Sequence, residues 1–175
     1  RPYNTWVGSG SDGLLRGSYR KIHLFDVELP DGTSLSESVA TASGNDPVVI
    51  DALGFKLGLS ICYDLRFPEL YRKLVDRGAN LITVPSAFTL QTGKDHWHVL
   101  LRARAIESQS WLVAAAQWGR HPKNRASYGH ALFCDPWGTI AAECPDGVGV
   151  AVGDIDAAFT ERVRRSLPSL AHRKL

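Results

Sequence analysis

The sequence predicts an α/β fold, and three observations lead to that prediction. Continuous apolar runs, which are typical of strands buried on both faces, cover residues 56–62, 79–85 and 111–117. Helical spacing of apolar residues fills the two intervals between these runs, over residues 68–77 and about 95–109. Strands and helices that alternate in this way are typical of a parallel sheet covered by its connecting helices.

The segment before these elements predicts a strand pair and a long loop. Residues 3–7 and 14–22 have strand character and flank a turn cluster rich in Gly and Ser. Residues 23–47 show no sustained periodicity, so we expect a loop of unusual length there, and long ordered loops are usually functional. Residues 48–50 then predict a strand that forms a hairpin with the first buried strand.

The helix ends and the C-terminal segments follow local signals. Pro68 suits the first position of a helix, and Gly78 lies just beyond its predicted end. Residues 121–129 predict a polar loop, and Asp156 predicts the cap of a last helix that ends near Leu167. Three short strands are expected between them, at residues 131–134, 139–144 and 150–155.

Composition indicates an ordinary globular chain. It has 175 residues, 44% of them hydrophobic, and its 20 Lys and Arg against 18 Asp and Glu give a net charge of +2. No repeat or linker divides it, so residues 1–175 are expected to form a single domain. The longest apolar stretch, residues 111–116, is far shorter than the roughly 18 residues that cross a membrane, and no signal segment opens the chain.

The number of cysteines and the net charge indicate the cellular compartment and the class of partner that we expect. The odd number of cysteines, Cys62, Cys134 and Cys144, argues against a disulfide framework and favours a reducing compartment, with the cytoplasm the simplest choice. A small net charge argues against nucleic acid as a partner, so the basic residues near the C-terminus are interpreted as a solvated helix face. These residues are Arg162, Arg164, Arg165, Arg173 and Lys174.

Cys62 is the sharpest candidate for chemistry, because it leaves a buried strand and enters a turn just before a helix. Backbone N–H groups at such a corner favour a thiolate and an adjacent oxyanion, as acyl transfer through a thioester requires. The alternative is a small core residue. A buried Lys21 would stabilise a tetrahedral oxyanion, whereas on a solvated strand edge it would have no such role. Glu28 and Glu37 are candidate general bases in the predicted loop, with ordinary surface carboxylates as the alternative.

The sequence predicts neither a metal ion nor another cofactor. His96 and His98 are two residues apart, so on a helix they do not face the same side. No Cys-x-x-Cys or His-x-x-x-His spacing is present.

Several motifs in order resemble the nitrilase superfamily, the carbon–nitrogen hydrolases. The resemblance extends over nearly the whole chain and is closest to the branch of deaminated-glutathione amidases and omega-amidases. Arg120-His121 shortly before the Arg125 motif favours the deaminated-glutathione amidases within it. The motifs are Tyr19-Arg20-Lys21-Ile22-His23-Leu24, Cys62-Tyr63-Asp64-Leu65-Arg66-Phe67-Pro68-Glu69, Pro85-Ser86-Ala87-Phe88, His96-Trp97, Arg125-Ala126-Ser127-Tyr128-Gly129-His130 and Asp135-Pro136-Trp137-Gly138.

The resemblance implies an αββα sandwich, of which this chain represents the C-terminal two-thirds, and dimers or higher homo-oligomers. It implies hydrolysis of a small carboxylate-bearing amide by a Glu, Lys and Cys triad, with Cys62 as nucleophile, Lys21 as the triad lysine, ammonia as leaving group and water resolving the thioester. Such a nucleophile predicts a reactive thiol of low pKa. Glu37 matches a second loop glutamate near the substrate, a role for which Glu28 is the weaker match.

The same resemblance implies four substrate-binding residues. Arg66 matches an arginine that grips a substrate carboxylate, although an ion pair with Asp64 or Glu69 is an equal alternative. Phe88 and Thr92 match an aromatic wall and a hydroxyl donor, and Tyr63 would give its backbone N–H to the oxyanion. Metal ions have no part in this site.

One departure from the family leaves alternatives open. The first glutamate of the triad normally precedes the Tyr-Arg-Lys motif, and both Glu28 and Glu37 follow it. The expectation is that the sequence is a fragment of a longer enzyme; a truncated enzyme without its general base and a binding or dimerisation module are the alternatives. Nitrile hydrolysis and carbamoyl-amide hydrolysis remain alternative reactions.

Overall fold

The computed structural model describes residues 1–29, 32, 34–122 and 125–174. Its centre is a six-stranded sheet in the order β12-β11-β8-β7-β6-β5. The three middle strands β6, β7 and β8 are parallel, and the outer strands are antiparallel to their neighbours. The strands of this sheet are β5 (Val48–Ala52), β6 (Phe55–Leu59), β7 (Leu81–Thr83), β8 (Trp111–Ala114), β11 (Leu132–Cys134) and β12 (Ile140–Glu143).

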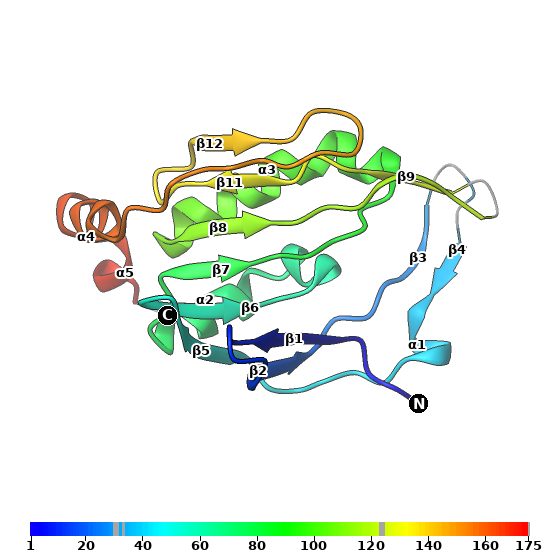
Figure 1. Cartoon of the computed structure of the whole chain (residues 1–175), viewed down its shortest axis with the longest axis horizontal. Helices are drawn as coiled ribbons and strands as arrows, with labels where there is room; N and C mark the ends of the chain where they lie inside the picture. The colour runs from blue at the N-terminus through cyan, green and yellow to red at the C-terminus, as the bar shows by residue number, and fades with distance from the viewer. Residues whose placement is uncertain (30–31, 33, 123–124, 175) are drawn as a thin grey trace.

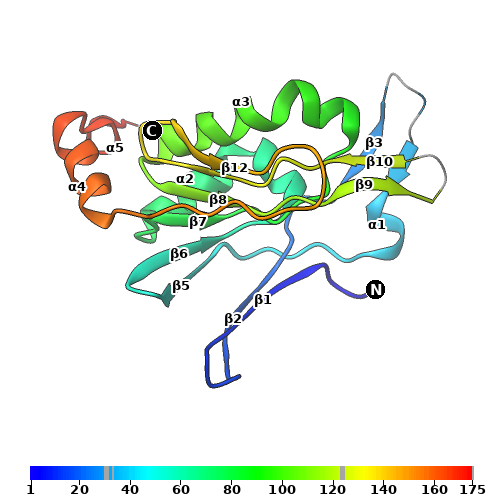
Figure 2. The same cartoon turned by 45° about the horizontal axis from the view of Figure 1, so that its top comes forward.

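Helices α2 (Pro68–Asp76) and α3 (Leu90–Ser108) cover one face of this sheet, as Figures 1 and 2 show. The core lies between these layers. Leu59, Ile82 and Leu112 from the parallel strands are fully buried together with Leu74 of α2 and Leu101 of α3. Burial of a leucine or isoleucine stabilises the fold by about 1.5–3 kcal/mol. The predicted α/β class and its buried strands are therefore confirmed.

The remaining helices are short or lie at one end of the sheet. A 3₁₀ turn, η1 (Cys62–Arg66), connects β6 to α2. Helix α4 (Ala157–Ser166) is capped by Asp156, whose carboxylate accepts a hydrogen bond from the Ala158 N–H at 2.8 Å, as predicted. Helix α5 (Ser169–His172) follows it. None of the described helices combines the length and apolarity needed to cross a membrane.

Among the described residues, three hairpins lie outside the sheet, and two of them correct the sequence prediction. The first, β1 (Thr5–Ser9) with β2 (Leu15–Arg20), is as expected and packs beside β5. A Cβ on Gly17 would lie 2.6 Å from Ile50, so the hairpin approaches the sheet closely at that point.

The other two hairpins fall where loops were expected. The long loop of residues 23–47 contains β3 (Asp26–Glu28), β4 (Ser34–Ser36) and helix α1 (Glu37–Ala40). Pro30 and Asp31 of this loop, for which the sequence Pro-Asp-Gly indicates a turn, lie outside the described residues. The polar loop of residues 121–129 contributes to β9 (Trp118–His121) and β10 (Arg125–Tyr128). Strands of three or four residues are too short to produce a clear alternating pattern, which is why both predictions were wrong.

Two further predictions need correction. Helix α3 begins at Leu90 rather than near Asp95, because the Thr89 hydroxyl accepts a hydrogen bond from the Thr92 N–H and caps an extra turn without apolar periodicity. Residues 150–155 form no strand. This segment crosses the face of β11 and β12 at Gly153 without pairing with either strand, and its valines are exposed. Residues of high strand propensity form a strand only where a neighbouring strand offers hydrogen bonds.

Candidate active site

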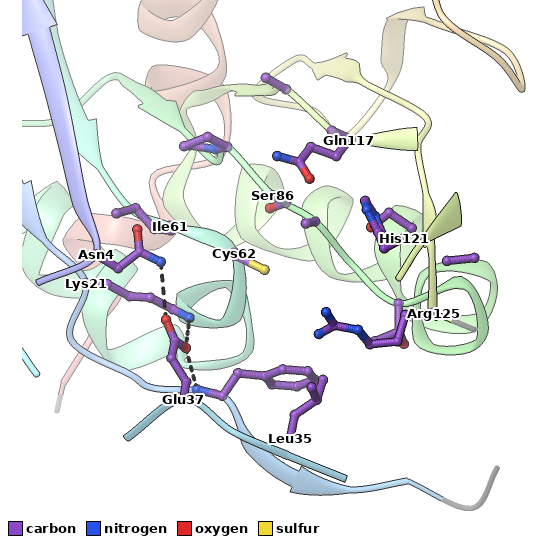
Figure 3. A pocket seen from close by; sticks show the side chains of 18 of the residues that line it. Asn4, Lys21, Leu35, Glu37, Ile61, Cys62, Ser86, Gln117, His121 and Arg125 are labelled. Atoms are coloured by element: carbon purple, nitrogen blue, oxygen red, sulfur yellow. Dashed lines mark hydrogen bonds and ion pairs between the residues drawn. The ribbon is translucent and has the colours of Figure 1, made fainter. Parts of the chain in front are cut away.

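A cavity of about 1060 Å³ opens at the carboxyl ends of the parallel strands. Cys62, Ser86 and Gln117 line it, and each lies three residues beyond the end of β6, β7 or β8. In α/β sheets, ligands bind at this edge, where the chain leaves neighbouring strands in different directions. Figure 3 shows these side chains around the cavity, with Lys21 and Glu37 facing them from the N-terminal segment.

The backbone at Cys62 forms a sharp corner. Its φ angle is +49°, in the left-handed region that side-chain-bearing residues rarely adopt. The Cys62 N–H donates a hydrogen bond to the Pro85 carbonyl at 2.9 Å, which ties this corner to the segment after β7. Strained backbone of this kind costs about 1–3 kcal/mol and is concentrated at functional sites. The corner directs the sulfur into the cavity (Figure 3).

Lys21 and Glu37 form a largely buried ion pair beside this sulfur (Figure 3). The Lys21 side chain is only 3% exposed, and its Nζ lies 2.5 Å from Glu37 Oε2. The same carboxylate oxygen accepts the Phe25 N–H at 2.7 Å, while Oε1 accepts the Asn4 amide at 3.2 Å. Lys21 is therefore held in the cavity wall, and the alternative of a solvated strand edge is excluded.

Glu37 is an anchor for the lysine because it stays ionised. Burial raises its pKa, but hydrogen bonds from Lys21, Phe25 and Asn4 outweigh burial and hold the pKa of Glu37 below its ordinary value. A carboxylate of lowered pKa is a weak base. Glu37 is thus suited to orient the Lys21 ammonium rather than to remove a proton from the thiol.

The Cys62 thiol corrects the sequence expectation of a low pKa. Burial raises the pKa of Cys62, and this effect outweighs hydrogen bonding to Ala87 and Ser86 and the favourable charge of Lys21. The negative charge of Glu37 also raises it. A nucleophilic role for this thiol therefore requires that its proton be removed during the reaction.

This arrangement predicts the pH dependence of Cys62 alkylation. We expect iodoacetamide to modify Cys62 slowly at neutral pH and at a rate that is still rising at pH 9, because the thiolate is the nucleophile. Peptide mapping by mass spectrometry measures this rate separately from the rates of buried Cys134 and Cys144. A plateau of the Cys62 rate below pH 8 contradicts the raised pKa.

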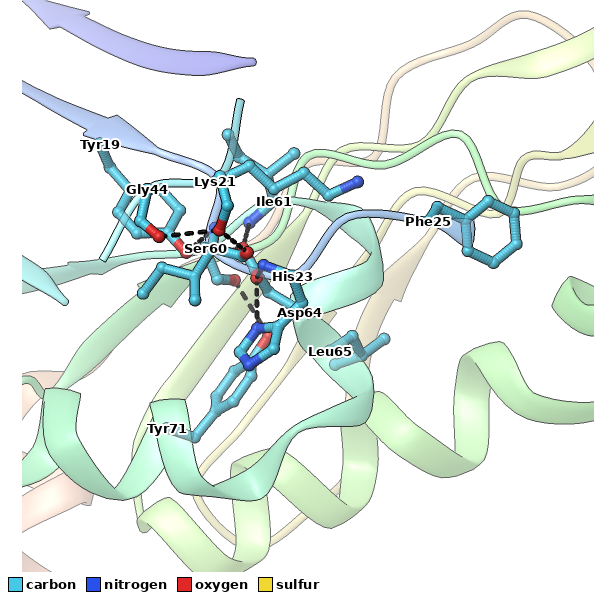
Figure 4. A network of polar contacts seen from close by, with 12 residues as sticks. Tyr19, Lys21, His23, Phe25, Gly44, Ser60, Ile61, Asp64, Leu65 and Tyr71 are labelled. Atoms are coloured by element: carbon cyan, nitrogen blue, oxygen red, sulfur yellow. Dashed lines mark hydrogen bonds and ion pairs between the residues drawn. The ribbon is translucent and has the colours of Figure 1, made fainter. Parts of the chain in front are cut away.

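A buried carboxylate that the sequence analysis did not select links Lys21 to Cys62. Asp64 Oδ2 accepts hydrogen bonds from the Tyr19 hydroxyl at 2.7 Å and the Ile61 N–H at 2.9 Å. Its Oδ1 contacts the His23 N–H at 3.1 Å and His23 Nδ1 at 2.8 Å. Figure 4 shows this network, in which residues on both sides of Lys21 bind a residue of the Cys62 turn. Asp64 therefore sets the position of the lysine relative to the sulfur.

The four predicted substrate-binding residues do not line the cavity among the described residues. Phe88 is buried against Trp97, with ring centroids 4.8 Å apart. Thr92 shares a hydrogen bond of 2.8 Å with the Thr89 hydroxyl at the start of α3. The Tyr63 ring packs against Phe25 and Phe67.

Arg66 lies over Phe88, with its guanidinium carbon 5.3 Å from the ring centroid, and contacts His96 Nδ1 at 3.2 Å. Within the described residues, it pairs with neither Asp64 nor Glu69. The structural ion pair considered for Arg66 is therefore absent, and its substrate-binding role stays a prediction.

Residues missed by the sequence analysis line the far side of the cavity. Arg125 and His121 come from the hairpin β9–β10, and Figure 3 shows both side chains on the wall opposite Lys21. His121 Nε2 lies 2.7 Å from the Ser127 hydroxyl. Arg125 is exposed and pairs with no carboxylate in the part of the chain that the structure describes. The Arg-Ala-Ser-Tyr-Gly-His motif was the available signal, but its assignment to a loop hid its position.

The carbon-nitrogen hydrolase family matches residues 1–165 of this sequence. The chain belongs to this family. The deaminated glutathione amidase of Mus musculus is 51% identical over 174 residues, which cover 98% of this chain and 54% of that protein. This carbon–nitrogen hydrolase chain thus spans about half the length of that relative.

Solved structures support the same membership. The Caenorhabditis elegans NitFhit protein has a TM-score of 0.93 at 46% identity, over 99% of this chain and 42% of that one. A mutant amidase from Nesterenkonia has a TM-score of 0.75 at 29% identity, over 94% of this chain and 61% of that one. In the Nesterenkonia amidase, acrylamide is added to the active-site cysteine. The nitrilase-type fold of this chain is therefore confirmed.

Proposed function

We propose that this domain hydrolyses the C–N bond of a small carboxylate-bearing amide through a thioester on Cys62. The single observation that carries the proposal is the position of Cys62, on a strained corner in a cavity that also holds the Lys21–Glu37 pair. A thiol nucleophile, a fixed ammonium for the oxyanion and a sheltered pocket are the requirements of acyl transfer.

The reaction has two balanced steps. The Cys62 sulfur forms a bond to the amide carbon, the C–N bond breaks, and the thiol proton leaves on ammonia. Water then attacks the thioester carbon, the C–S bond breaks, the hydroxyl of the water stays on the acid product, and its other proton returns to the sulfur. Lys21 stabilises the negative oxygen of both tetrahedral intermediates. A glutamate outside these residues, implied by the family resemblance, would carry the proton between sulfur and nitrogen.

Arg125 is the substrate anchor that the cavity favours. Its guanidinium is on the cavity wall with Cys62, whereas Arg66 contacts His96 and Phe88. A planar guanidinium binds a carboxylate through two parallel hydrogen bonds. We therefore propose Arg125 as the carboxylate-binding residue, with Arg66, Phe88, Thr92 and Tyr63 as supports of the surrounding wall.

Similarity to a deaminated glutathione amidase at 51% identity supports this substrate class. The test measures ammonia release from the monoamide of a short dicarboxylic acid, from a neutral amide of equal length and from the matching nitrile. The chain is assayed as it stands and with an N-terminal extension that supplies the family's upstream glutamate. We expect turnover of the monoamide only, in at least one of the two forms.

The variant Arg125→Gln tests recognition of the substrate carboxylate separately from the type of bond that is hydrolysed. It should raise KM for the monoamide by about 10–100-fold, since a charged hydrogen-bonded pair contributes about 1.5–3 kcal/mol. Preference for the nitrile would overturn the amide assignment. Absence of ammonia from every substrate in both forms would favour a binding module.

Two further properties belong to the proposal. We propose a homo-oligomer, supported by the exposed apolar residues Val99 and Ile106 of α3 and by Trp137. The free cysteines Cys62, Cys134 and Cys144 support a reducing, cytoplasmic location. Light scattering after size-exclusion chromatography tests the first property, and a monomer mass would contradict it.

A further inference from the structure

We propose that His98, His130 and Glu143 bind a divalent transition-metal ion at a site separate from the Cys62 cavity. His98 belongs to α3, His130 precedes β11, and Glu143 ends β12. None of the three lines the cavity. The proposal therefore does not depend on the proposed hydrolase activity.

The three side chains converge on a single point. One ligand atom from each residue lies within 4.8 Å of the other two. His98 Nε2 is 2.8 Å and His130 Nδ1 is 2.6 Å from the same oxygen, Glu143 Oε1. Segments far apart in the sequence supply these atoms, which explains why a search for closely spaced ligands did not detect the group.

The orientation of the side chains fits a shared ion. His98 Nε2 and His130 Nδ1 both face the same oxygen, Glu143 Oε1. The other nitrogen of His130, Nε2, lies 3.0 Å from Asp146 Oδ1, on the side of the ring away from Glu143. A dication bound by the three facing atoms would therefore leave the contact between His130 and Asp146 in place.

The surroundings of His130 match those of a metal-binding histidine. Such histidines usually donate their second ring N–H to a carboxylate, which fixes the ring, and Asp146 occupies that position. The Trp97 indole donates to the His130 carbonyl at 2.8 Å, and the Tyr128 ring stacks on the imidazole with centroids 4.3 Å apart. The backbone of His130 is held at a φ of +60°.

Ligand chemistry selects the ion. Two imidazoles and one carboxylate suit Zn²⁺ and its transition-metal neighbours, whereas Mg²⁺ and Ca²⁺ prefer oxygen ligands. Ligand atoms around tetrahedral zinc are about 3.3 Å apart, so the contacts to Glu143 must open by about half an ångström. The side chains are 18–31% exposed, which allows that movement and leaves a position for water.

The experiment measures zinc binding by equilibrium dialysis of the chelator-stripped chain at pH 7. We expect one zinc ion per chain. Glu143→Gln and His98→Gln should each weaken binding by more than about 100-fold, and Asp146→Asn by about 10–100-fold, which is the usual effect of losing a carboxylate behind a ligating histidine. His172→Gln, which removes an exposed histidine of α5, should bind zinc as the parent does.

Cys62→Ala separates the proposed site from the nucleophile, because thiolates also bind zinc. We expect this variant to bind zinc normally. Loss of zinc binding in Cys62→Ala, its retention in both Glu143→Gln and His98→Gln, or no stoichiometric binding by the parent would each overturn the proposal.

A spectrum of the parent chain with Co²⁺ makes the test independent of variant folding. We expect visible bands of a cobalt ion with nitrogen and oxygen ligands. A strong sulfur-to-cobalt charge-transfer band would place the ion on a cysteine and would also overturn the proposal.

Discussion

Lys21→Met should lower kcat for the monoamide by about 10²–10³-fold, the usual effect of removing a group that stabilises an oxyanion. Methionine keeps the length of the side chain and removes the ammonium that Glu37 holds at 2.5 Å. The pKa of Cys62 should also rise further, because burial is the main cause of its raised value and the charge of Lys21 opposes it. Ammonia release and alkylation of Cys62 as a function of pH measure the two effects.

Lys56→Met is the matched control for this variant. Lys56 is also paired with a carboxylate, Asp51, at 2.7 Å, but both side chains are largely exposed. We expect unchanged kcat and an unchanged Cys62 alkylation profile in this control. A Lys21→Met variant that keeps kcat within a few fold of the parent would exclude Lys21 from the chemistry.

Asp64→Ala should destabilise the fold by about 3–5 kcal/mol, the largest stability effect that we expect at the site. The change leaves the Tyr19 hydroxyl and the N–H groups of Ile61 and His23 without their acceptor in a buried place. The free energy of unfolding from urea titration measures the loss. Tyr19→Phe, which removes one of these donors, should cost about 1 kcal/mol.

Asp51→Ala is the control for a carboxylate in an exposed pair. It should change the free energy of unfolding by less than about 0.5 kcal/mol. If Asp64→Ala were equally mild, the network around Asp64 would not hold the Lys21 and Cys62 segments together.

The parallel strands and the helices that cover them could be predicted from the sequence, because continuous or periodic apolar runs mark these elements. Leu59, Ile82 and Leu112 lie in such runs and form the core of the parallel strands. The hairpins β3–β4 and β9–β10 were missed, since a strand of three or four residues shows little periodicity.

The site could be predicted only where a motif marked it. The resemblance selected Cys62, Lys21 and Glu37, and the structure brings all three to one cavity. Asp64 and Arg125 escaped prediction because their roles depend on contacts with distant segments, such as the bond from Tyr19 to Asp64 across 45 residues. The raised pKa of Cys62 likewise arises from burial, which a local pattern does not reveal.

The most direct test of the thioester on Cys62 is the intact mass of the protein during turnover of the dicarboxylic monoamide, followed by peptide mapping. The account predicts an acyl adduct on Cys62, none on Cys134 or Cys144, and none in Cys62→Ala. Ammonia release with no adduct on Cys62, or continued turnover by Cys62→Ala, would contradict it.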